Sequence, residues 1–151
     1  MKYPLLAFVI ILFLSCDNND PEKVDYKVQN EQDILAYINE NNLNAQKSES
    51  GLYYVINEEG SGERPTENSD VTVAYKGKFL NGNVFDQSTA NGISFNLQRV
   101  IRGWTEGITY FKEGGSGLLL VPSHLGYGSN TTRGIPGGSV LIFNVHLISV
   151  D

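Results

Sequence analysis

Apolar and polar residues alternate in several short stretches of the chain, which is the pattern of half-buried β-strands. The clearest stretch is 71–76, where Val71, Val73 and Tyr75 alternate with small or polar residues. Related patterns predict further strands at 52–57, 84–86, 94–97, 117–121 and 140–150. The sequence therefore predicts a domain made mostly of short strands.

Turn residues separate these strands. Asn81-Gly82 lies between two of them and predicts a hairpin, because this dipeptide readily adopts a two-residue turn. A glycine-rich loop over 122–139 precedes the last strand, in which His146 alternates with apolar residues and is expected to face solvent. The apolar face of that strand carries Leu141, Phe143, Val145 and Leu147.

Two other stretches have the spacing of short helices. Residues 31–43 place apolar side chains at near-helical intervals, with Asn30 as a possible cap, and residues 104–111 form the second helical stretch. We expect the first helix to pack against the domain; a partner-binding arm is the alternative. Antiparallel strands with one short helix laid across a face make an α+β fold.

The N-terminal residues have the layout of a secretory signal: a basic start, an apolar run over 5–14 and then a small residue. The run is too short to cross a bilayer as a helix. Phe13-Leu14-Ser15-Cys16 resembles the lipobox of bacterial lipoproteins, in which the cysteine is acylated. An ordinary signal peptide whose cleavage site happens to contain cysteine is the alternative.

These patterns divide the chain into three segments. Residues 1–15 are the expected signal peptide, and residues 51–151 are the expected folded domain. Residues 16–50 are expected to hold the lipidated Cys16, a flexible tether of polar and charged residues, and the first short helix.

Composition and charge exclude several classes of function. The chain has 151 residues and a formal charge of −6, so nucleic acid is not an expected partner. A single cysteine excludes an internal disulfide framework. The two histidines lack metal-ligand spacing and no cofactor motif is present, so we expect neither a metal site nor another cofactor.

Aromatic and aliphatic residues are frequent at the strand ends and in the loops, and each of them alone fits the core of a small domain. Five motifs in a fixed order change this interpretation. They are Val73-Ala74-Tyr75-Lys76-Gly77, Phe85-Asp86-Gln87-Ser88, Val100-Ile101-Arg102-Gly103-Trp104, Leu125-Gly126-Tyr127-Gly128, and Ile135-Pro136 leading to Leu141-Ile142-Phe143. Their order and spacing resemble those of the FKBP-type peptidyl-prolyl isomerases over about residues 51–151.

The resemblance implies a twisted antiparallel sheet wrapped around one short α-helix, with an apolar cavity between them. It implies that Trp104 forms the cavity floor, and that the Ile101 N–H and the Tyr127 hydroxyl donate hydrogen bonds to substrate carbonyls. The implied catalytic residues are Tyr75, Asp86, Tyr127 and Phe143. The implied substrate-binding residues are Phe85, Phe95, Val100, Ile101, Trp104 and Ile135.

Asp86 has more than one possible role. It could act electrostatically on the twisting amide or order Tyr127, and the alternative is a carboxylate that only caps a turn. The family often has a basic residue that pairs with this carboxylate, but residues 87–94 contain neither Arg nor Lys, so we expect tyrosine hydroxyls to serve instead. The loop between Tyr127 and Phe143 is also one residue shorter than in the smallest family members.

The implied activity is cofactor-free acceleration of X–Pro bond rotation in exported or envelope proteins, which assists their folding. A non-catalytic module that grips a proline-containing segment is the alternative. Expected partners are proline-containing polypeptides, macrolide inhibitors of the family, and a membrane through the lipid anchor, with the chain as a monomer. The leader, tether and helix also resemble family lipoproteins linked to gliding motility. The expected location is the cell envelope, on the periplasmic side of the inner or outer membrane or at the cell surface.

Overall fold

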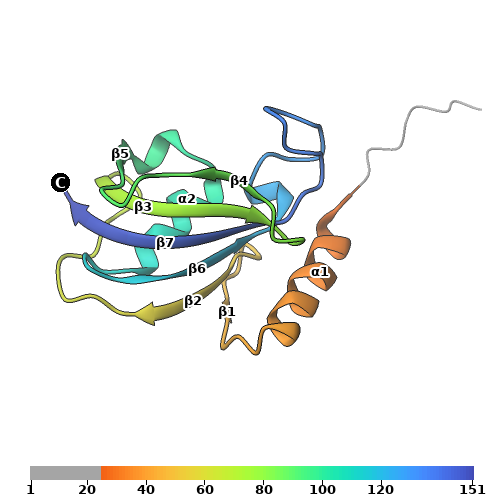
Figure 1. Cartoon of the computed structure of the whole chain (residues 1–151), viewed down its shortest axis with the longest axis horizontal. Coiled ribbons are helices and arrows are strands. Elements are labelled where there is room, and N and C mark those ends of the chain that lie inside the picture. Colours follow the sequence, from red (N-terminus) through yellow and green to blue (C-terminus); the bar gives the residue numbers. More distant parts are fainter. Residues whose placement is uncertain (1–24) are drawn as a thin grey trace, which may run out of the picture.

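The computed structural model describes residues 25–151, in which seven antiparallel strands form one sheet and the short helix α2 lies across its inner face (Figure 1). The strands are β1 (Gln46–Lys47), β2 (Tyr53–Glu58), β3 (Asp70–Phe79), β4 (Val84–Gln87), β5 (Ile93–Asn96), β6 (Ser116–Val121) and β7 (Leu141–Val150). The helices are α1 (Lys27–Glu40) and α2 (Arg102–Gly107), with 3-10 turns at Leu97–Arg99, Ile108–Tyr110 and Ser123–Leu125. The predicted α+β class is confirmed.

The centre of the sheet is the pair β3 and β7. The strand order is β1-β2-β6-β7-β3-β4, and β5 pairs with the first half of β3. The predicted hairpin joins β3 to β4, and its Gly82 has a φ of +86° that a residue with a side chain rarely adopts. His146 is exposed on β7, as its alternation with buried neighbours predicts.

The main core lies between the sheet and α2. It contains the inward residues of β3, β6 and β7, including the apolar face predicted for the last strand. Two glycines let α2 lie close against β6: a Cβ on Gly103 would come within 2.6 Å of Val121 Cγ1, and one on Gly107 within 2.7 Å of Leu119 Cδ2. These two close approaches hold the short helix α2 against β6.

A second core explains the unbroken apolar run of β6. Helix α1 covers part of the outer face of the sheet, where its fully buried Ile34 packs with Leu118 and Leu120 of β6 and with Ile142 of β7. Because Leu119 and Val121 face α2 instead, β6 is buried on both sides. The expectation that the first helix packs against the domain is confirmed.

Asn30 joins α1 to the domain, and the prediction that it caps the helix is wrong. The helix begins at Lys27, so Asn30 lies within it, and its side chain is turned inward with only 1 % exposure. Its Nδ2 donates to the Gly138 carbonyl at 2.9 Å, and its Oδ1 accepts from the Ser123 N–H at 2.8 Å. One side chain thus pairs two backbone groups that belong to the loop over 122–139.

Both helices also differ from their predicted bounds. Helix α1 ends at Glu40 instead of continuing to residue 43, because Asn42 adopts a φ of +50° and the Leu43 N–H turns back to the Ile38 carbonyl at 3.0 Å. This is a Schellman ending, and Leu43 still packs in the second core beside Ile38. Helix α2 begins before Trp104, since the Trp104 N–H already donates to the Ile101 carbonyl at 2.8 Å.

A salt bridge adds to the attachment of α1. Glu31 accepts from Lys47 Nζ at 2.7 Å and from the Tyr53 hydroxyl at 2.5 Å, and these hydrogen bonds lower the pKa of the Glu31 carboxyl. Within residues 25–151, no helix is both long and apolar enough to span a bilayer. The predicted signal peptide, the Cys16 lipobox and the start of the tether lie outside the described residues.

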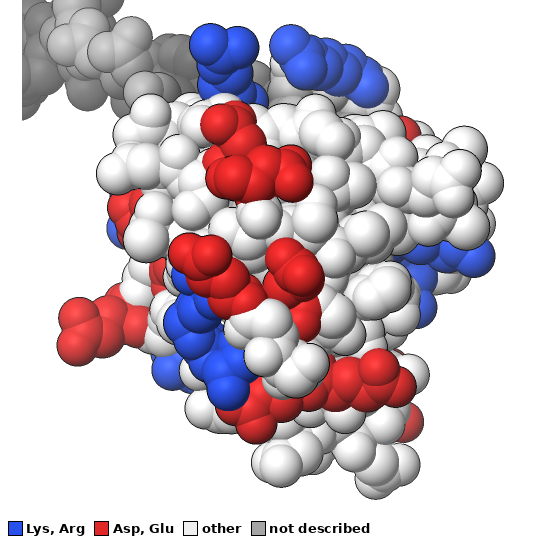
Figure 2. All heavy atoms as spheres, turned by 90° about the vertical axis from the view of Figure 1, so that its left-hand side faces the viewer, with Lys and Arg blue, Asp and Glu red and all other residues white. Residues whose placement is uncertain are grey.

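Acidic side chains gather at the end of the molecule where β7 ends (Figure 2). There the Glu113 N–H donates to the Glu63 carbonyl at 2.8 Å, and Glu113 Oε2 accepts from the Val150 N–H at 3.0 Å. The Asp151 N–H donates to the Asp70 carbonyl at 2.9 Å. The Glu113 carboxylate therefore closes the hydrogen bonding of the last strand.

Candidate active site

A cavity of about 550 Å³ opens between strands β3 to β5, the start of α2 and the loop over 122–139. It is lined by Tyr75, Phe85, Asp86, Ile93, Phe95, Arg99, Val100, Ile101, Trp104, Tyr127, Thr132, Arg133 and Phe143. The structure thus brings together nine of the ten residues predicted for catalysis and substrate binding. Their individual roles stay predictions.

Trp104 lines this cavity within a group of aromatic rings. Its ring meets Tyr75 edge-on at 5.0 Å and 88° and Phe143 at 5.2 Å and 85°, and Phe95 lies 5.4 Å away. The side chain is only 5 % exposed, and its buried Nε1–H has no hydrogen-bond partner within residues 25–151. Ring packing, which favours such edge-to-face contacts, therefore holds the indole in place.

Phe85 and Phe143 form one wall, and Gly77 makes room for both. A Cβ at Gly77 would lie 2.7 Å from Phe85 Cζ and 2.9 Å from Phe143 Cε1, closer than any real Cβ contact. The two phenylalanine rings meet edge-on at 5.6 Å and 86°. The packing of these two rings therefore explains why the motif at 73–77 ends in glycine.

Tyr75 and Asp86 form the polar side of the cavity. The Tyr75 hydroxyl donates to Asp86 Oδ2 at 2.6 Å, which agrees with the expectation that a tyrosine hydroxyl replaces the missing basic partner. Burial, and next the bond to Asp86, raise the pKa of Tyr75 above its ordinary value. Tyr75 therefore keeps its proton throughout the physiological range, and one oxygen of Asp86 is engaged.

Ile101 and Tyr127 meet a condition that their predicted role requires. Ile101 precedes α2 in an extended conformation, and its carbonyl accepts from the first turn of the helix while its N–H takes part in no hydrogen bond in the described part of the chain. Tyr127 is half-buried at the cavity, and its hydroxyl likewise has no partner there. Neither donor is therefore engaged within residues 25–151.

Ile135 is the exception among the predicted site residues. It is 6 % exposed, belongs to the main core and is not part of the cavity lining. The reason is a two-residue turn in which Thr132 and Ile135 pair through their backbones, so that Thr132 and Arg133 reach the cavity instead. Sequence reasoning did not single out Ile93, Arg99 or Thr132. For Arg133 it predicts a solvated side chain, with contact to an acidic partner as the alternative.

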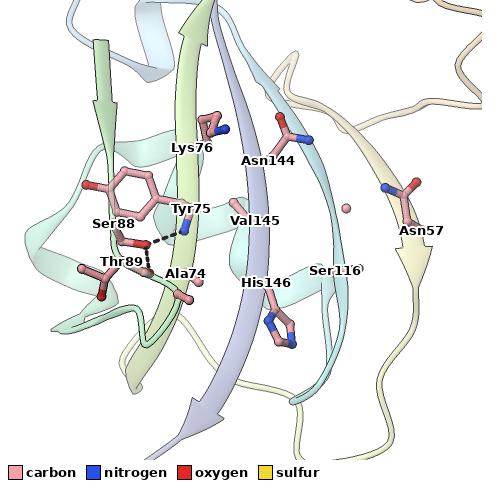
Figure 3. Close-up of a pocket in the computed structure, with 12 residues that line it drawn as sticks. Asn57, Ala74, Tyr75, Lys76, Ser88, Thr89, Ser116, Asn144, Val145 and His146 are labelled. Atoms are coloured by element: carbon pink, nitrogen blue, oxygen red, sulfur yellow. Dashed lines mark hydrogen bonds between the residues drawn. The ribbon is translucent and has the colours of Figure 1, made fainter. Parts of the chain in front are cut away.

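A second hollow, of about 390 Å³, lies on the outer face of the sheet. Figure 3 shows that its side chains, among them Lys76, Asn144 and His146, come from neighbouring strands and are mostly polar. Ser88 Oγ accepts from the Tyr75 N–H at 2.9 Å and donates to the Thr89 carbonyl at 2.8 Å, which closes the edge of β3 (Figure 3). Its lining includes neither Trp104 nor a phenylalanine, so this hollow lacks the group of aromatic rings found in the first cavity.

Comparison with known proteins identifies the family. The model of the FKBP-type peptidyl-prolyl cis-trans isomerases matches residues 61–148. The chain belongs to this family. The FKBP-type peptidyl-prolyl cis-trans isomerase FkpA of Buchnera aphidicola subsp. Schizaphis graminum is 46 % identical over 107 residues, which are 69 % of this chain and 42 % of that protein.

Solved structures agree with the family assignment. The crystal structure of FkpA from Escherichia coli superposes with a TM-score of 0.74 at 36 % identity, covering 83 % of this chain and 61 % of that one. A peptidyl-prolyl cis-trans isomerase from Pseudomonas syringae superposes with a TM-score of 0.72 at 27 % identity, covering 85 % and 97 %. The chain spans less than half the length of the curated FkpA relative, so its own activity and partners are taken up as proposals.

Proposed function

We propose that this chain is a peptidyl-prolyl cis-trans isomerase that accelerates rotation about X–Pro bonds in polypeptides. The observation that carries the proposal is the indole of Trp104 at the base of an aromatic cavity, held edge-on by Tyr75 and Phe143. A flat apolar base with aromatic walls suits the pyrrolidine ring of proline. Family membership supports the same conclusion.

The reaction needs no proton transfer and no nucleophile. Rotation about a peptide bond has a barrier of about 18–20 kcal/mol, because amide resonance is lost as the bond twists. The planar amide is more polar than the twisted one, so an apolar cavity favours the twisted state relative to the planar one. The cavity residues therefore suit the chemistry without acting as a nucleophile or a general base.

The open polar groups would hold the chain on either side of the rotating bond. In this proposal the Ile101 N–H and the Tyr127 hydroxyl donate to substrate carbonyls, which fixes one part of the chain while the other turns. Tyr75 holds Asp86 by a 2.6 Å hydrogen bond, so the carboxylate stays near the cavity as an electrostatic partner of the twisting amide.

Substitutions in the cavity test this proposal. We expect Phe143→Ala and Tyr127→Phe to slow peptide isomerisation, and a macrolide inhibitor of the family to compete with the peptide. His146→Ala is the matched control, because His146 lies on the same strand as Phe143 but is exposed on the outer face. Equal activity of Phe143→Ala and His146→Ala would place the catalytic site elsewhere.

We further propose that a lipid on Cys16 anchors the chain in the cell envelope, where it assists folding of exported proteins as a monomer. The support is the apolar run that ends at Ser15-Cys16. We expect mass spectrometry of the mature N-terminus to find a diacylated or triacylated Cys16, and Cys16→Ser to leave the membrane fraction. An unmodified cysteine in the mature chain would contradict the anchor, and with it the likeness to motility lipoproteins.

A further inference from the structure

Two arginines stand at the mouth of the aromatic cavity. Arg99 and Arg133 both line it together with Trp104, and both are exposed. Neither guanidinium group takes part in an ion pair or a hydrogen bond within residues 25–151. In a chain with a formal charge of −6, two cationic groups with all their donors open are therefore concentrated at one cavity.

The fold presents Arg133 on a tight turn. The Thr132 N–H donates to the Ile135 carbonyl at 3.0 Å, and the Ile135 N–H donates back to Thr132 at 2.8 Å. Between them Arg133 has a φ of +50° and Gly134 a φ of +79°, the conformation of a two-residue hairpin turn. A residue with a side chain is disfavoured at such a φ, so the paired flanks are what hold Arg133 beside the cavity.

Nearby carboxylates do not neutralise the two arginines by direct pairing. Asp86 lines the cavity, but one of its oxygens accepts from Tyr75. Asp70 shares an adjoining hollow with Arg99, without an ion pair between them. A guanidinium group has five N–H donors and binds a carboxylate with two parallel hydrogen bonds, so both arginines can still bind an incoming carboxylate.

We propose that Arg99 and Arg133 make this cavity selective for prolines that have a glutamate or aspartate as the neighbouring residue. This selectivity rests on the proposed isomerase function, since it assumes that the proline ring occupies the aromatic cavity. With the ring above Trp104, the residues flanking the proline leave the cavity past its mouth, where the two guanidinium groups lie.

Matched peptides test the selectivity. Glutamate and glutamine have nearly the same shape, so the ratio of kcat/KM for Glu–Pro over Gln–Pro peptides, and for Pro–Glu over Pro–Gln peptides, isolates the charge. From the strength of solvent-exposed ion pairs, we expect a ratio of about three to ten at low salt in at least one series. Since exposed charges are screened, the ratio should fall toward one at about 1 M salt.

Charge-matched variants assign the effect to the arginines. Arg99→Gln and Arg133→Gln should each lower the Glu/Gln ratio, and the double variant should bring it close to one. Lys76→Gln with Lys78→Gln is the control, because these two β3 residues alternate with Tyr75 and so face away from the cavity. This control removes the same net charge and should keep the wild-type ratio.

A second readout keeps the selectivity separate from catalysis. Trp104 is the single tryptophan of the chain and lies in the cavity, so its fluorescence reports peptide binding to the purified full chain whether or not rotation is accelerated. If peptides bind with a Glu/Gln preference but no peptide is isomerised faster, the proposed function fails and the selectivity survives. If a Leu–Pro peptide is isomerised faster but both ratios are near one, the selectivity is overturned and the isomerase stands.

Gly134→Ala tests the turn itself. No atom lies within 4 Å of the added Cβ, so the change acts only through the positive φ of residue 134. We expect it to lower the Glu/Gln ratio, because alanine at a φ of +79° strains the turn that presents Arg133. A ratio that stays at the wild-type value in both Gly134→Ala and Arg133→Gln would exclude Arg133 from the selectivity.

Discussion

Replacing Asn30 by alanine is expected to destabilise the fold, because Asn30 connects α1 to the loop over 122–139. Asn30 is 1 % exposed, and its side chain pairs with the Ser123 N–H and the Gly138 carbonyl. Alanine removes both partners at once. It also loosens the contact between α1 and the loop over 122–139, which carries Tyr127 and Arg133.

The size of the effect follows from how deeply each partner is buried. Ser123 is 5 % exposed, so its unpaired N–H should cost about 1–3 kcal/mol. Gly138 is half-buried, and water can reach its carbonyl at smaller cost. Alanine regains about 0.5 kcal/mol through its higher helix propensity. The free energy of unfolding should therefore fall by about 1–3 kcal/mol.

Urea unfolding of the full chain measures this difference. The midpoint should move to lower urea with an unchanged slope, which indicates a change in stability rather than in the unfolded state. Asn39→Ala is the matched control, because Asn39 lies on the same helix, is exposed, and makes no side-chain hydrogen bond in the described chain. Its effect should stay within about 0.5 kcal/mol.

Equal midpoints for Asn30→Ala and Asn39→Ala would refute the reasoning. That result would mean that the two hydrogen bonds of Asn30 are replaced by water without cost, and that the attachment of α1 depends on its apolar contacts and on the pairing of Glu31. Faster proteolysis between α1 and β1 in Asn30→Ala would instead show that the helix leaves the sheet.

Four further predictions concern α2, the salt bridge of α1 and Tyr75 in the cavity. Gly107→Ala should lower the free energy of unfolding by about 1–3 kcal/mol through overpacking, because its Cβ would lie 2.7 Å from Leu119 Cδ2; urea unfolding measures this. The pKa of the Glu31 carboxyl is lowered in the fold, so its ionised form stabilises the fold above the unfolded pKa, and this stabilisation is lost as pH falls through the folded pKa. Glu31→Gln should therefore make the free energy of unfolding less dependent on pH between pH 6 and 3. Tyr75→Phe should lower kcat/KM about two- to tenfold through loss of its bond to Asp86. In the wild type the raised pKa of Tyr75 should leave peptide isomerisation unchanged from pH 7 to 9.

Much of the fold was predictable from local patterns. The alternation at 71–76 and the Asn81-Gly82 turn correctly placed β3 and its hairpin, because both depend on residues close together in the chain. The residues that line the cavity came instead from the order of five motifs resembling a known family. Periodicity alone could not separate a cavity aromatic such as Phe95 from a core residue.

The failed prediction for Asn30 depends on contacts distant in sequence. Its residue type suits a helix end and so predicts a cap, whereas its partners lie at Ser123 and Gly138. Ile135 lies in the core and Arg133 lines the cavity, on either side of a two-residue turn, and a role of Ile135 in substrate binding stays a prediction. The direction of the Asn30 side chain follows from tertiary pairing, which no local pattern encodes.

The most direct test of the central claim is the rate of cis-to-trans relaxation of a short Leu–Pro peptide with the purified full chain added. The uncatalysed process takes tens to hundreds of seconds, so acceleration is easily measured. We expect the relaxation rate to rise in proportion to the concentration of the chain, and this acceleration to be lost in Phe143→Ala but kept in His146→Ala. A folded chain that binds the peptide and leaves the rate unchanged would contradict it and favour a module that only grips proline-containing segments.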